Sequence, residues 1–264
     1  MRRSDRIQRK RKGLLALACL GLFTAAGYAG KAAAQREPAP PAEAAVPFRA
    51  GEQLDYRVGW QAIATAATVQ FRVVERRPFY GRAAWHFQAN ARTVEPASYL
   101  YSLDDQFDSY TDTTTLAGIQ YEMYIREENR KETNIIRMTT EGEPASGNGP
   151  SVRVPAGTRD PIGVFFWLRS VDWAKTAEAR TNIYDGKKLY ELRARRAAER
   201  EEVKVPAGKY AATKLELRVY ERGREMQNTH FFCWLAQDAA RTPVLIEAES
   251  PVGSVRVELT AVRQ

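Results

Sequence analysis

From residue 52 onward, apolar and polar residues alternate along most of the chain. Because successive side chains of a β-strand point to opposite faces of a sheet, such alternation predicts strands with one buried and one wet face. The apolar positions of the clearest predicted strands are Leu54/Tyr56/Val58/Trp60, Val69/Phe71/Val73, Trp85/Phe87/Ala89/Ala91, Ile119/Tyr121/Met123/Ile125, Leu215/Leu217/Val219 and Val255/Val257/Leu259.

Turn signals separate these runs. Asp185-Gly186 is typical of a two-residue hairpin, whose central residues both need a positive φ. Further signals occur at Asn129-Arg130, Ala207-Gly208, Arg222-Gly223 and 251–254. Since no helical segments alternate with the runs, the pattern predicts about eleven or twelve strands in one antiparallel meander. We expect the charged run 187–196 at a sheet edge, because Lys and Arg discourage edge-to-edge pairing.

One segment, DPIGVFFWLRS at 160–170, breaks the alternation. Asp160 suits a helix N-cap, and Pro161 suits the first helical position, where its missing N–H costs nothing. Residues 162–168 are apolar on all sides, which indicates burial, and polarity resumes at Arg169 and Ser170. A buried strand is the alternative. We therefore predict a mainly β fold: a single strongly curved antiparallel sheet, an open or partly closed barrel, around one short buried helix near 160–172.

The N-terminal 34 residues are typical of a secretory signal peptide. A basic head is followed by an apolar run and by Ala32–Ala34, which predicts cleavage after Ala34, with cleavage after Ala29 as the alternative. The run is short for a membrane anchor, which needs about 20 residues. A lipoprotein is not expected, because Ala16 stands where the motif before Cys19 requires Leu. The Pro/Ala-rich residues 35–47 are interpreted as a linker, and residues 48–264 as one β-rich domain.

Removal of the predicted signal peptide would change the net charge of the chain. Residues 1–34 hold eight of the 40 Lys and Arg residues and one of the 32 Asp and Glu residues. The remaining chain therefore has 32 basic and 31 acidic residues, and it lacks the basic field that nucleic acid requires. We expect a periplasmic protein that contacts the membrane only through its signal peptide. Its single remaining cysteine, Cys233, cannot form an intramolecular disulfide.

Candidate catalytic groups are few. Alternation places His86 on the polar face of its strand, where a solvated histidine is expected. His230 shares a face with Phe232 and Trp234, which favours a structural, hydrogen-bonded histidine over a general base. Cys233 lies three residues from His230, so the two side chains point to opposite faces, which disfavours a Cys–His nucleophile.

The acidic cluster at 104–112 could offer oxygens to a hard cation. However, Asp104, Asp108 and Asp112 are far apart on one strand face and no glycine-tight calcium loop is present, so we expect a solvated outer face. The sequence also lacks G-x-S-x-G, P-loop, H-E-x-x-H and C-x-x-C motifs. We therefore predict no metal, no cofactor and no enzymatic activity. A hydrolase that uses His230 is a remote alternative.

Aromatic residues are the remaining candidates for function. They can form a filled core, or they can line a cavity for a lipid-like or other apolar ligand, or for an apolar segment of an envelope partner. The rival hypothesis is an envelope scaffold or interaction protein with a solid core. The predicted ligand-binding residues are Tyr56, Trp60, Phe71, Trp85, Phe87, Phe165, Phe166, Trp167 and Trp234.

Several segments resemble the domain of unknown function 3108 family of exported bacterial envelope proteins, in order and spacing across residues 46–262. They are FRAGEQLDYRVGW (48–60), YSLDDQFDSYTDTTTLAGIQYE (101–122), DPIGVFFWLRS (160–170), YDGKKLYELR (184–193), VPAGKYAATKLEL (205–217) and CWLAQDAARTPVLIEAESPVGSVRVEL (233–259). The resemblance implies an exported, β-rich single domain of no established activity. ATAA (64–67) departs from the family, which often has a glycine there. More distantly, a curved sheet around a helix is similar to periplasmic lipoprotein carriers, a fold-level analogy only.

Overall fold

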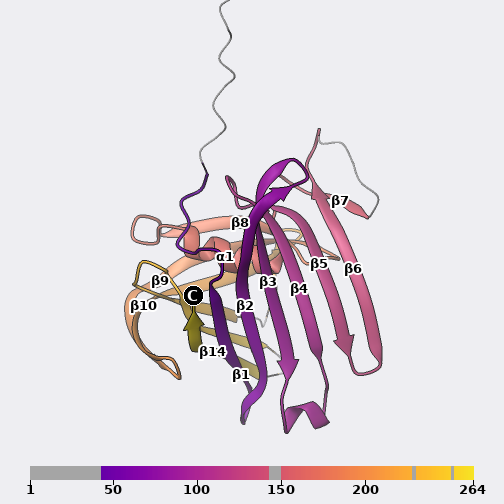
Figure 1. Cartoon of the computed structure of the whole chain (residues 1–264). Helices are drawn as coiled ribbons and strands as arrows, with labels where there is room; N and C mark the ends of the chain where they lie inside the picture. The colour runs from indigo at the N-terminus through magenta and orange to yellow at the C-terminus, as the bar shows by residue number, and fades with distance from the viewer. Residues whose placement is uncertain (1–42, 143–149, 228–229, 251–252) are drawn as a thin grey trace, which may run out of the picture. The chain divides into compact units, whose positions relative to one another are not determined.

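The computed structural model describes residues 43–142, 150–227, 230–250 and 253–264. These residues form one sheet of 14 strands, a helix α1 (Pro161–Ser170) and a short 3₁₀ helix η1 (Ala97–Tyr99) (Figure 1). The strands are β1 (Gln53–Trp60), β2 (Ile63–Phe79), β3 (Arg82–Thr93), β4 (Asp104–Asp112), β5 (Gly118–Glu127), β6 (Arg130–Thr139), β7 (Ser151–Arg153), β8 (Glu178–Tyr184), β9 (Leu189–Val205), β10 (Gly208–Glu221), β11 (Arg224–Glu225), β12 (His230–Ala236), β13 (Pro243–Ser250) and β14 (Gly253–Arg263).

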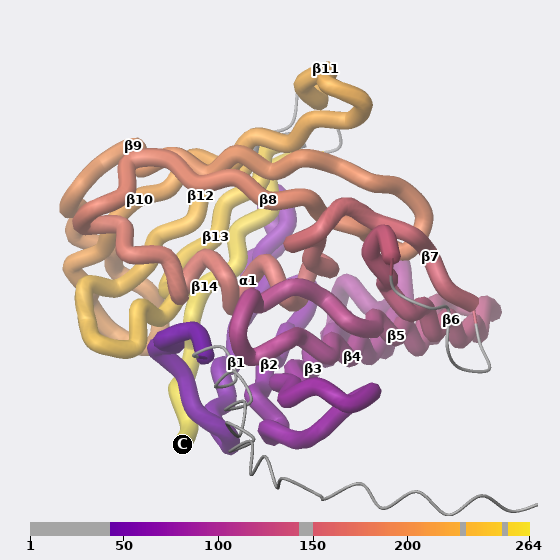
Figure 2. The backbone as a smooth tube through the Cα atoms, turned by 90° about the horizontal axis from the view of Figure 1, so that it is seen from above, coloured from indigo at the N-terminus to yellow at the C-terminus, as the bar shows by residue number. Residues whose placement is uncertain are grey.

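The strand order is β7-β6-β5-β4-β3-β2-β1-β14-β13-β12-β10-β9-β8, with β11 paired to β10. Every pair is antiparallel except β6–β7. The sheet curls around α1 without closing, because β7 and β8 remain at its two ends (Figure 2). The predicted curved, partly closed sheet is confirmed. Its strands outnumber the prediction because β7 and β11 have only three and two residues, too few for alternation to reveal.

The predicted sheet edge at 187–196 is wrong. These residues belong mostly to β9, which pairs with β8 on one side and β10 on the other. The charges on this strand pair across the sheet instead of protecting an edge: the Arg195 guanidinium lies 2.6 Å from the Glu216 carboxylate on β10. A charged strand can therefore lie inside a sheet, because opposite charges on neighbouring strands pair and stabilise it.

A hairpin connects β8 and β9 at the predicted place, but its two central residues are Gly186 and Lys187 instead of Asp185 and Gly186. The reason is that the Asp185 N–H donates to the Lys188 carbonyl. The Asp185 carboxylate accepts hydrogen bonds from the Lys187 and Lys188 backbone N–H groups, and Gly186 has a φ of +96°. A Cβ atom at Gly186 would collide with the methyl group of Met123 on β5. The turn therefore packs directly on the opposite half of the sheet, which brings the two ends of the open barrel together.

The predicted helix is confirmed, and its start is fixed by Asp160. One Asp160 carboxylate oxygen accepts from the N–H groups of Ile162 (2.9 Å) and Gly163 (2.8 Å). The other accepts from the Ser109 hydroxyl on β4 at 2.6 Å. Burial raises the pKa of Asp160 to about 6 despite these bonds. The N-cap therefore also attaches α1 to the sheet.

The predicted return to polarity at Arg169 is wrong, because its side chain is completely buried. Its Nη1 lies 2.5 Å from a carboxylate oxygen of Glu52, which is also buried, and its Nη2 donates to the Ala240 carbonyl at 3.0 Å. The guanidinium also lies over the rings of Phe48 and Phe166. A charge can be buried when it is paired and hydrogen-bonded in this way.

Residues 43–52 begin the described part and cross one end of the sheet. The Ala44 N–H donates to the Thr113 carbonyl, and Phe48 is buried against Phe87 and Phe166. Contacts to the sheet thus start inside the stretch predicted as a linker. The predicted signal peptide, its cleavage site and Cys19 lie outside the described residues. Within the described ranges, no helix is long and apolar enough to cross a membrane.

Candidate functional site

The inner face of the sheet, which faces α1, was the predicted ligand site. Beside the helix this face is densely packed. The Phe165 ring stacks on Phe71 with centroids 4.0 Å apart, and the Phe166 ring stacks on Phe87 at 3.9 Å. The strand residues of this region, which we call the helix-covered face, are at most 1% exposed: Leu54, Tyr56, Val73, Phe87 and Leu259.

Six of the nine predicted ligand-binding residues meet in this packed region. Direct ring contacts join the pairs Tyr56–Phe71, Tyr56–Phe165, Phe71–Phe165, Phe165–Phe166, Phe166–Phe87 and Phe87–Trp85. Edge-on and stacked pairs of this kind stabilise a core beyond their buried area.

The other three predicted residues make no ring contact with this group, although Trp234 belongs to the same buried cluster and Trp167 packs against it. Trp167 is half-buried on α1, with the Arg159 guanidinium 4.9 Å from its ring centroid. Trp60 lies at the end of β1 remote from the helix and is 38% exposed. Trp234 points away from α1, since its neighbour Cys233 packs against the helix; its indole N–H donates to Glu201.

The same inner face continues beyond the helix, and there it is less buried. Directly paired residues of a sheet lie on one face, so the register identifies the next inward positions. Val58 and Val257 pair one step beyond Tyr56 and Leu259, and Val257 pairs in turn with Ile246. We call the half-buried apolar residues of the inner face the uncovered face; Val69 among them pairs directly with the buried Tyr56, so this region borders the helix-covered face. Its members are Val58, Val69, Ala91, Phe107, Leu217, Val219, Ile246 and Val257.

The uncovered face has contributions from both halves of the sheet. Val69 and Phe107 pack against the cluster that includes Phe165, while Leu217 and Val219 pack against the cluster that includes Leu168 on the other side of the helix. The face is thus a continuous apolar wall that meets the side of α1. It can take part in hydrophobic contact but contains no acid, base or nucleophile among these side chains.

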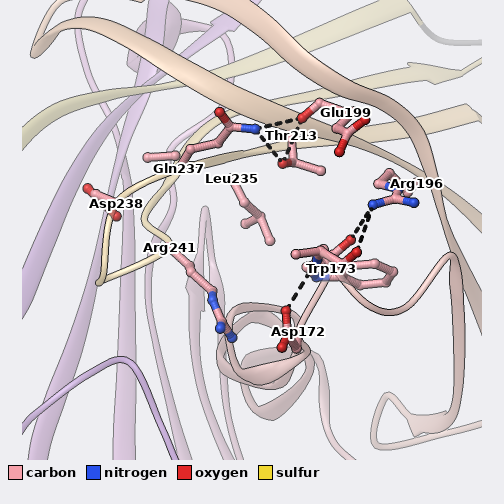
Figure 3. A pocket seen from close by; sticks show the side chains of 11 residues that line it. Asp172, Trp173, Arg196, Glu199, Thr213, Leu235, Gln237, Asp238 and Arg241 are labelled. Atoms are coloured by element: carbon pink, nitrogen blue, oxygen red, sulfur yellow. Dashed lines mark hydrogen bonds between the residues drawn. The ribbon is translucent and has the colours of Figure 1, made fainter.

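A polar pocket of about 270 Å³ lies at the C-terminal end of α1 (Figure 3). Its side chains come from the loop after the helix (Asp172, Trp173), from β9 (Arg196, Glu199) and from β12 and the following turn (Leu235, Arg241). This pocket was not predicted from the sequence. One signal was present: Arg196 has the same parity as the inward-facing Leu192 and Ala194, so a charged residue occupies an apolar face.

His86 is not the solvated residue that alternation predicted. Its side chain is only 13% exposed; the ring stacks on Tyr110, and Nε2 lies 2.6 Å from the Asp108 carboxylate. Burial raises the pKa of Asp108, but hydrogen bonds from His86, Gln106 and Gln88 outweigh it, so the pKa lies below its ordinary value. The outer face is polar yet buried here because long side chains of neighbouring strands cover one another.

The acidic cluster separates into three roles. Asp108 is buried in the histidine network, Asp104 is exposed, and Asp112 accepts from the Thr114 and Thr115 N–H groups at a turn. The predicted solvated face is therefore wrong for Asp108. Among the described residues, no three His, Cys, Asp or Glu side chains are grouped to hold a metal ion.

The other candidate nucleophile and base, Cys233 and His230, lie three residues apart on β12. Cys233 is buried against α1, and burial raises the pKa of its thiol to about 12, which keeps the thiol protonated. His230 begins β12, but its side chain lies outside the described part of the structure.

Comparison with known proteins identifies a family but not an activity. No curated protein matches the chain. It is similar to a β-barrel-like protein of domain of unknown function DUF1849 from Brucella abortus, at 10% identity and TM-score 0.49 over 83% of this chain and 99% of that chain. It is also similar to a candidate exported protein with a YmcC-like fold from Bacteroides fragilis, at 11% identity and TM-score 0.36 over 84% and 100%.

A candidate lipoprotein from Parabacteroides distasonis matches at 10% identity and TM-score 0.39, over 84% of this chain and 100% of that chain. Similarities this low support no inference about activity. The family comparison is more specific, because its match spans most of the described sheet, from β1 to β14. The model for the protein family of unknown function DUF3108 matches residues 55–260, so the resemblance is confirmed and this chain belongs to that family.

Proposed function

We propose that this protein is an exported, non-enzymatic protein of the cell envelope that binds a lipid-like apolar ligand on the uncovered face. The observation that carries the proposal is the change in burial along one sheet face. Tyr56 and Leu259 are at most 1% exposed, whereas Val58 and Val257, one pair further along the same strands, are half-buried. An apolar face left partly open is typical of a binding surface.

The energetics favour an apolar occupant over a polar one. Covering apolar surface contributes about 25 cal/mol per Å² removed from water. The eight side chains of the uncovered face are all apolar, so a polar ligand in contact with them would lose hydration without gaining hydrogen bonds. The acid beside them, Asp105, pairs with Ala91 and already accepts from the Arg126 N–H. An acyl chain loses no hydrogen bonds and can extend between Val69 of one half of the sheet and Leu217 of the other.

The aromatic residues of the helix-covered face then have a supporting role in this proposal. Phe165 and Phe166 fill the space beside α1 and close one end of the apolar wall. The predicted ligand-binding residue that best fits the uncovered face is Trp167, which is half-buried and packs against both core clusters. Export rests on the signal-peptide pattern of residues 1–34.

The test is titration of the delipidated protein with a fluorescent fatty acid. We expect saturable binding, and we expect Val69→Lys to weaken it at least tenfold, because a cation would enter the apolar face. Thr68→Lys is the matched control, since Thr68 is the neighbouring residue on the opposite, exposed face of β2. This control should bind like the wild type.

Two results would reject the ligand proposal. One is the absence of saturable binding to the wild type, and the other is an equal effect of the two lysine variants. Circular dichroism of each variant establishes that the sheet is intact before affinities are compared.

The stacked rings beside α1 favour a second candidate function, an envelope scaffold or interaction protein with a solid core. In that case the uncovered face would contact a protein partner instead of a small ligand. Mass spectrometry of the protein purified natively from the periplasm separates the two. A co-purifying lipid supports the first candidate, whereas a stoichiometric protein partner without lipid supports the second.

A further inference from the structure

The pocket at the C-terminal end of α1 has two arginines that are held in place without an ion-pair partner. Arg241 Nη1 donates to the carbonyls of Arg169, Ser170 and Val171, at 3.3, 3.4 and 3.1 Å. Arg196 Nη1 donates to the Trp173 carbonyl at 2.7 Å. Arg241 therefore holds the C-terminal end of α1, and Arg196 holds the loop that follows it (Figure 3).

These arginines differ from most others on the sheet surface. Neighbouring Arg195 pairs with Glu216 at 2.6 Å, and Arg193 pairs with Glu191 at 2.5 Å. Across the described residues, no carboxylate lies within 4.0 Å of the Arg196 or Arg241 nitrogens. Each guanidinium is oriented by backbone carbonyls through one nitrogen, and its remaining N–H groups stay available for a ligand. A preoriented guanidinium is well suited to bind a carboxylate.

The acidic residues of the pocket determine whether a ligand carboxylate should be accompanied by a positive charge. Asp172 is paired with Lys175 at 3.0 Å, and this pair together with the charge of Arg241 lowers the pKa of Asp172, so its charge is offset. Glu199 and Asp238 also line the pocket, and neither has an ion-pair partner within the described part of the chain. Arg196 and Arg241 thus share the lining of the pocket with two exposed carboxylates that have no ion-pair partner among the described residues. This balance disfavours a simple anion and favours a ligand that presents both charges.

The size and the walls of the pocket limit the ligand further. A volume of about 270 Å³ is below the range of drug-sized ligand sites, which begins at about 300 Å³. Leu235 and Trp173, at most 4% exposed, form the apolar wall of the pocket. Opposite the helix end, the Thr213 hydroxyl and the Gln237 amide both donate to the Glu199 carbonyl and form its polar wall. An amino-acid-sized molecule with a small apolar side chain matches these features.

We propose that this pocket binds a small zwitterion of amino-acid size. The ligand carboxylate lies between Arg196 and Arg241, its ammonium group faces Glu199, and its side chain contacts Leu235 and Trp173. The site is separate from the uncovered face, and the proposal does not depend on binding of an apolar ligand there.

The experiment measures binding of three matched probes to the full chain by isothermal titration calorimetry or saturation-transfer NMR. L-leucine has both charges, leucinamide lacks the carboxylate, and 4-methylpentanoate lacks the ammonium group. We expect L-leucine to bind at least tenfold more tightly than either of the other probes. Glycine, L-phenylalanine and L-glutamate extend the series to other side chains.

Neighbouring residues of β9 provide the variants. Arg196→Gln should weaken L-leucine binding at least tenfold, whereas Arg195→Gln, on the outer face, should leave it unchanged. Glu199→Gln should weaken L-leucine but not 4-methylpentanoate, because only the ammonium contact is lost. The Glu199 side chain accepts no hydrogen bond from other described residues, so this variant tests the site without disturbing the fold.

The proposal is overturned if no amino acid of the series binds at concentrations up to about 10 mM, which corresponds to a binding free energy weaker than about −3 kcal/mol. It is also overturned if 4-methylpentanoate binds as tightly as L-leucine, or if Arg196→Gln and Arg195→Gln behave alike while both keep the thermal midpoint of the wild type.

Discussion

The helix-covered face and the uncovered face belong to the same strands and have the same apolar character, yet they differ in burial. Tyr56 lies beneath Phe165, whereas Val58, two residues further along β1, is half-buried. What separates them is the position of α1: it lies across the strands near one end of the sheet, so it covers only that part of each strand (Figure 1). A single short helix therefore stabilises one end of the barrel and leaves apolar surface at the other.

The largest expected effect concerns the ion pair that fixes the helix-covered face. Arg169→Met leaves the buried Glu52 carboxylate without its partner, and removal of one member of a buried pair typically costs about 3–5 kcal/mol. We expect the free energy of unfolding to fall by this amount in chemical denaturation. Arg180→Met removes an exposed pair with Glu178 and should change it by less than about 1 kcal/mol. Similar losses in both variants would contradict the burial of Arg169.

A second prediction compares the same substitution on the two faces. Phe166→Ala removes a ring that stacks on Phe87 and should reduce the free energy of unfolding by about 3–5 kcal/mol. Phe107 lies on the uncovered face and is half-buried, so less of its surface leaves water on folding. Phe107→Ala should therefore reduce the free energy of unfolding by about half as much. Denaturation curves of both variants measure the difference. An equal cost would mean that the uncovered face is packed in solution.

Sequence patterns were sufficient for the sheet, the hairpins and the helix. Period-two alternation depends only on neighbouring residues of one strand, and the Asp160-Pro161 start depends only on local backbone chemistry. Arg169 and the interior position of β9 were missed because both depend on partners remote in the chain, Glu52 and Glu216. No local pattern encodes such pairings.

The candidate sites also divide into features that local patterns predict and features that depend on residues remote in the chain. Aromatic residues of the inner face and of the predicted helix were recognised as one group, and six of them are in contact. Whether such a group encloses a cavity depends on how much of each strand α1 covers. Alternation shows on which face a residue lies, but it does not show whether the helix covers that residue. The pocket formed by Arg196 and Arg241 joins β9 to the turn after β12, so its residues are 45 positions apart and no motif spacing could reveal it.

A third prediction uses pH to test the attachment of α1 to the sheet. The pKa of Asp160 is raised by burial to about 6, above its ordinary 3.8, so folding favours the protonated form. The free energy of unfolding should therefore increase as the pH falls from about 6 to about 4, by up to about 3 kcal/mol. Asp160→Asn keeps the N-cap acceptor and should abolish this increase. Denaturation at several pH values measures it, and an unchanged profile in the variant would assign the effect to another group.

The smallest effect on stability is expected on the uncovered face itself. Val69→Gln should lower the free energy of unfolding by less than about 1.5 kcal/mol, because the side chain is only half-buried. Its effect on surface chemistry should be larger, since an apolar face open to solvent binds the dye ANS in the native state. We expect the wild type and Thr68→Gln to enhance ANS fluorescence equally and Val69→Gln to enhance it less. If the native wild type did not enhance ANS fluorescence, the uncovered face would be closed to solvent. The two faces would then not differ in burial.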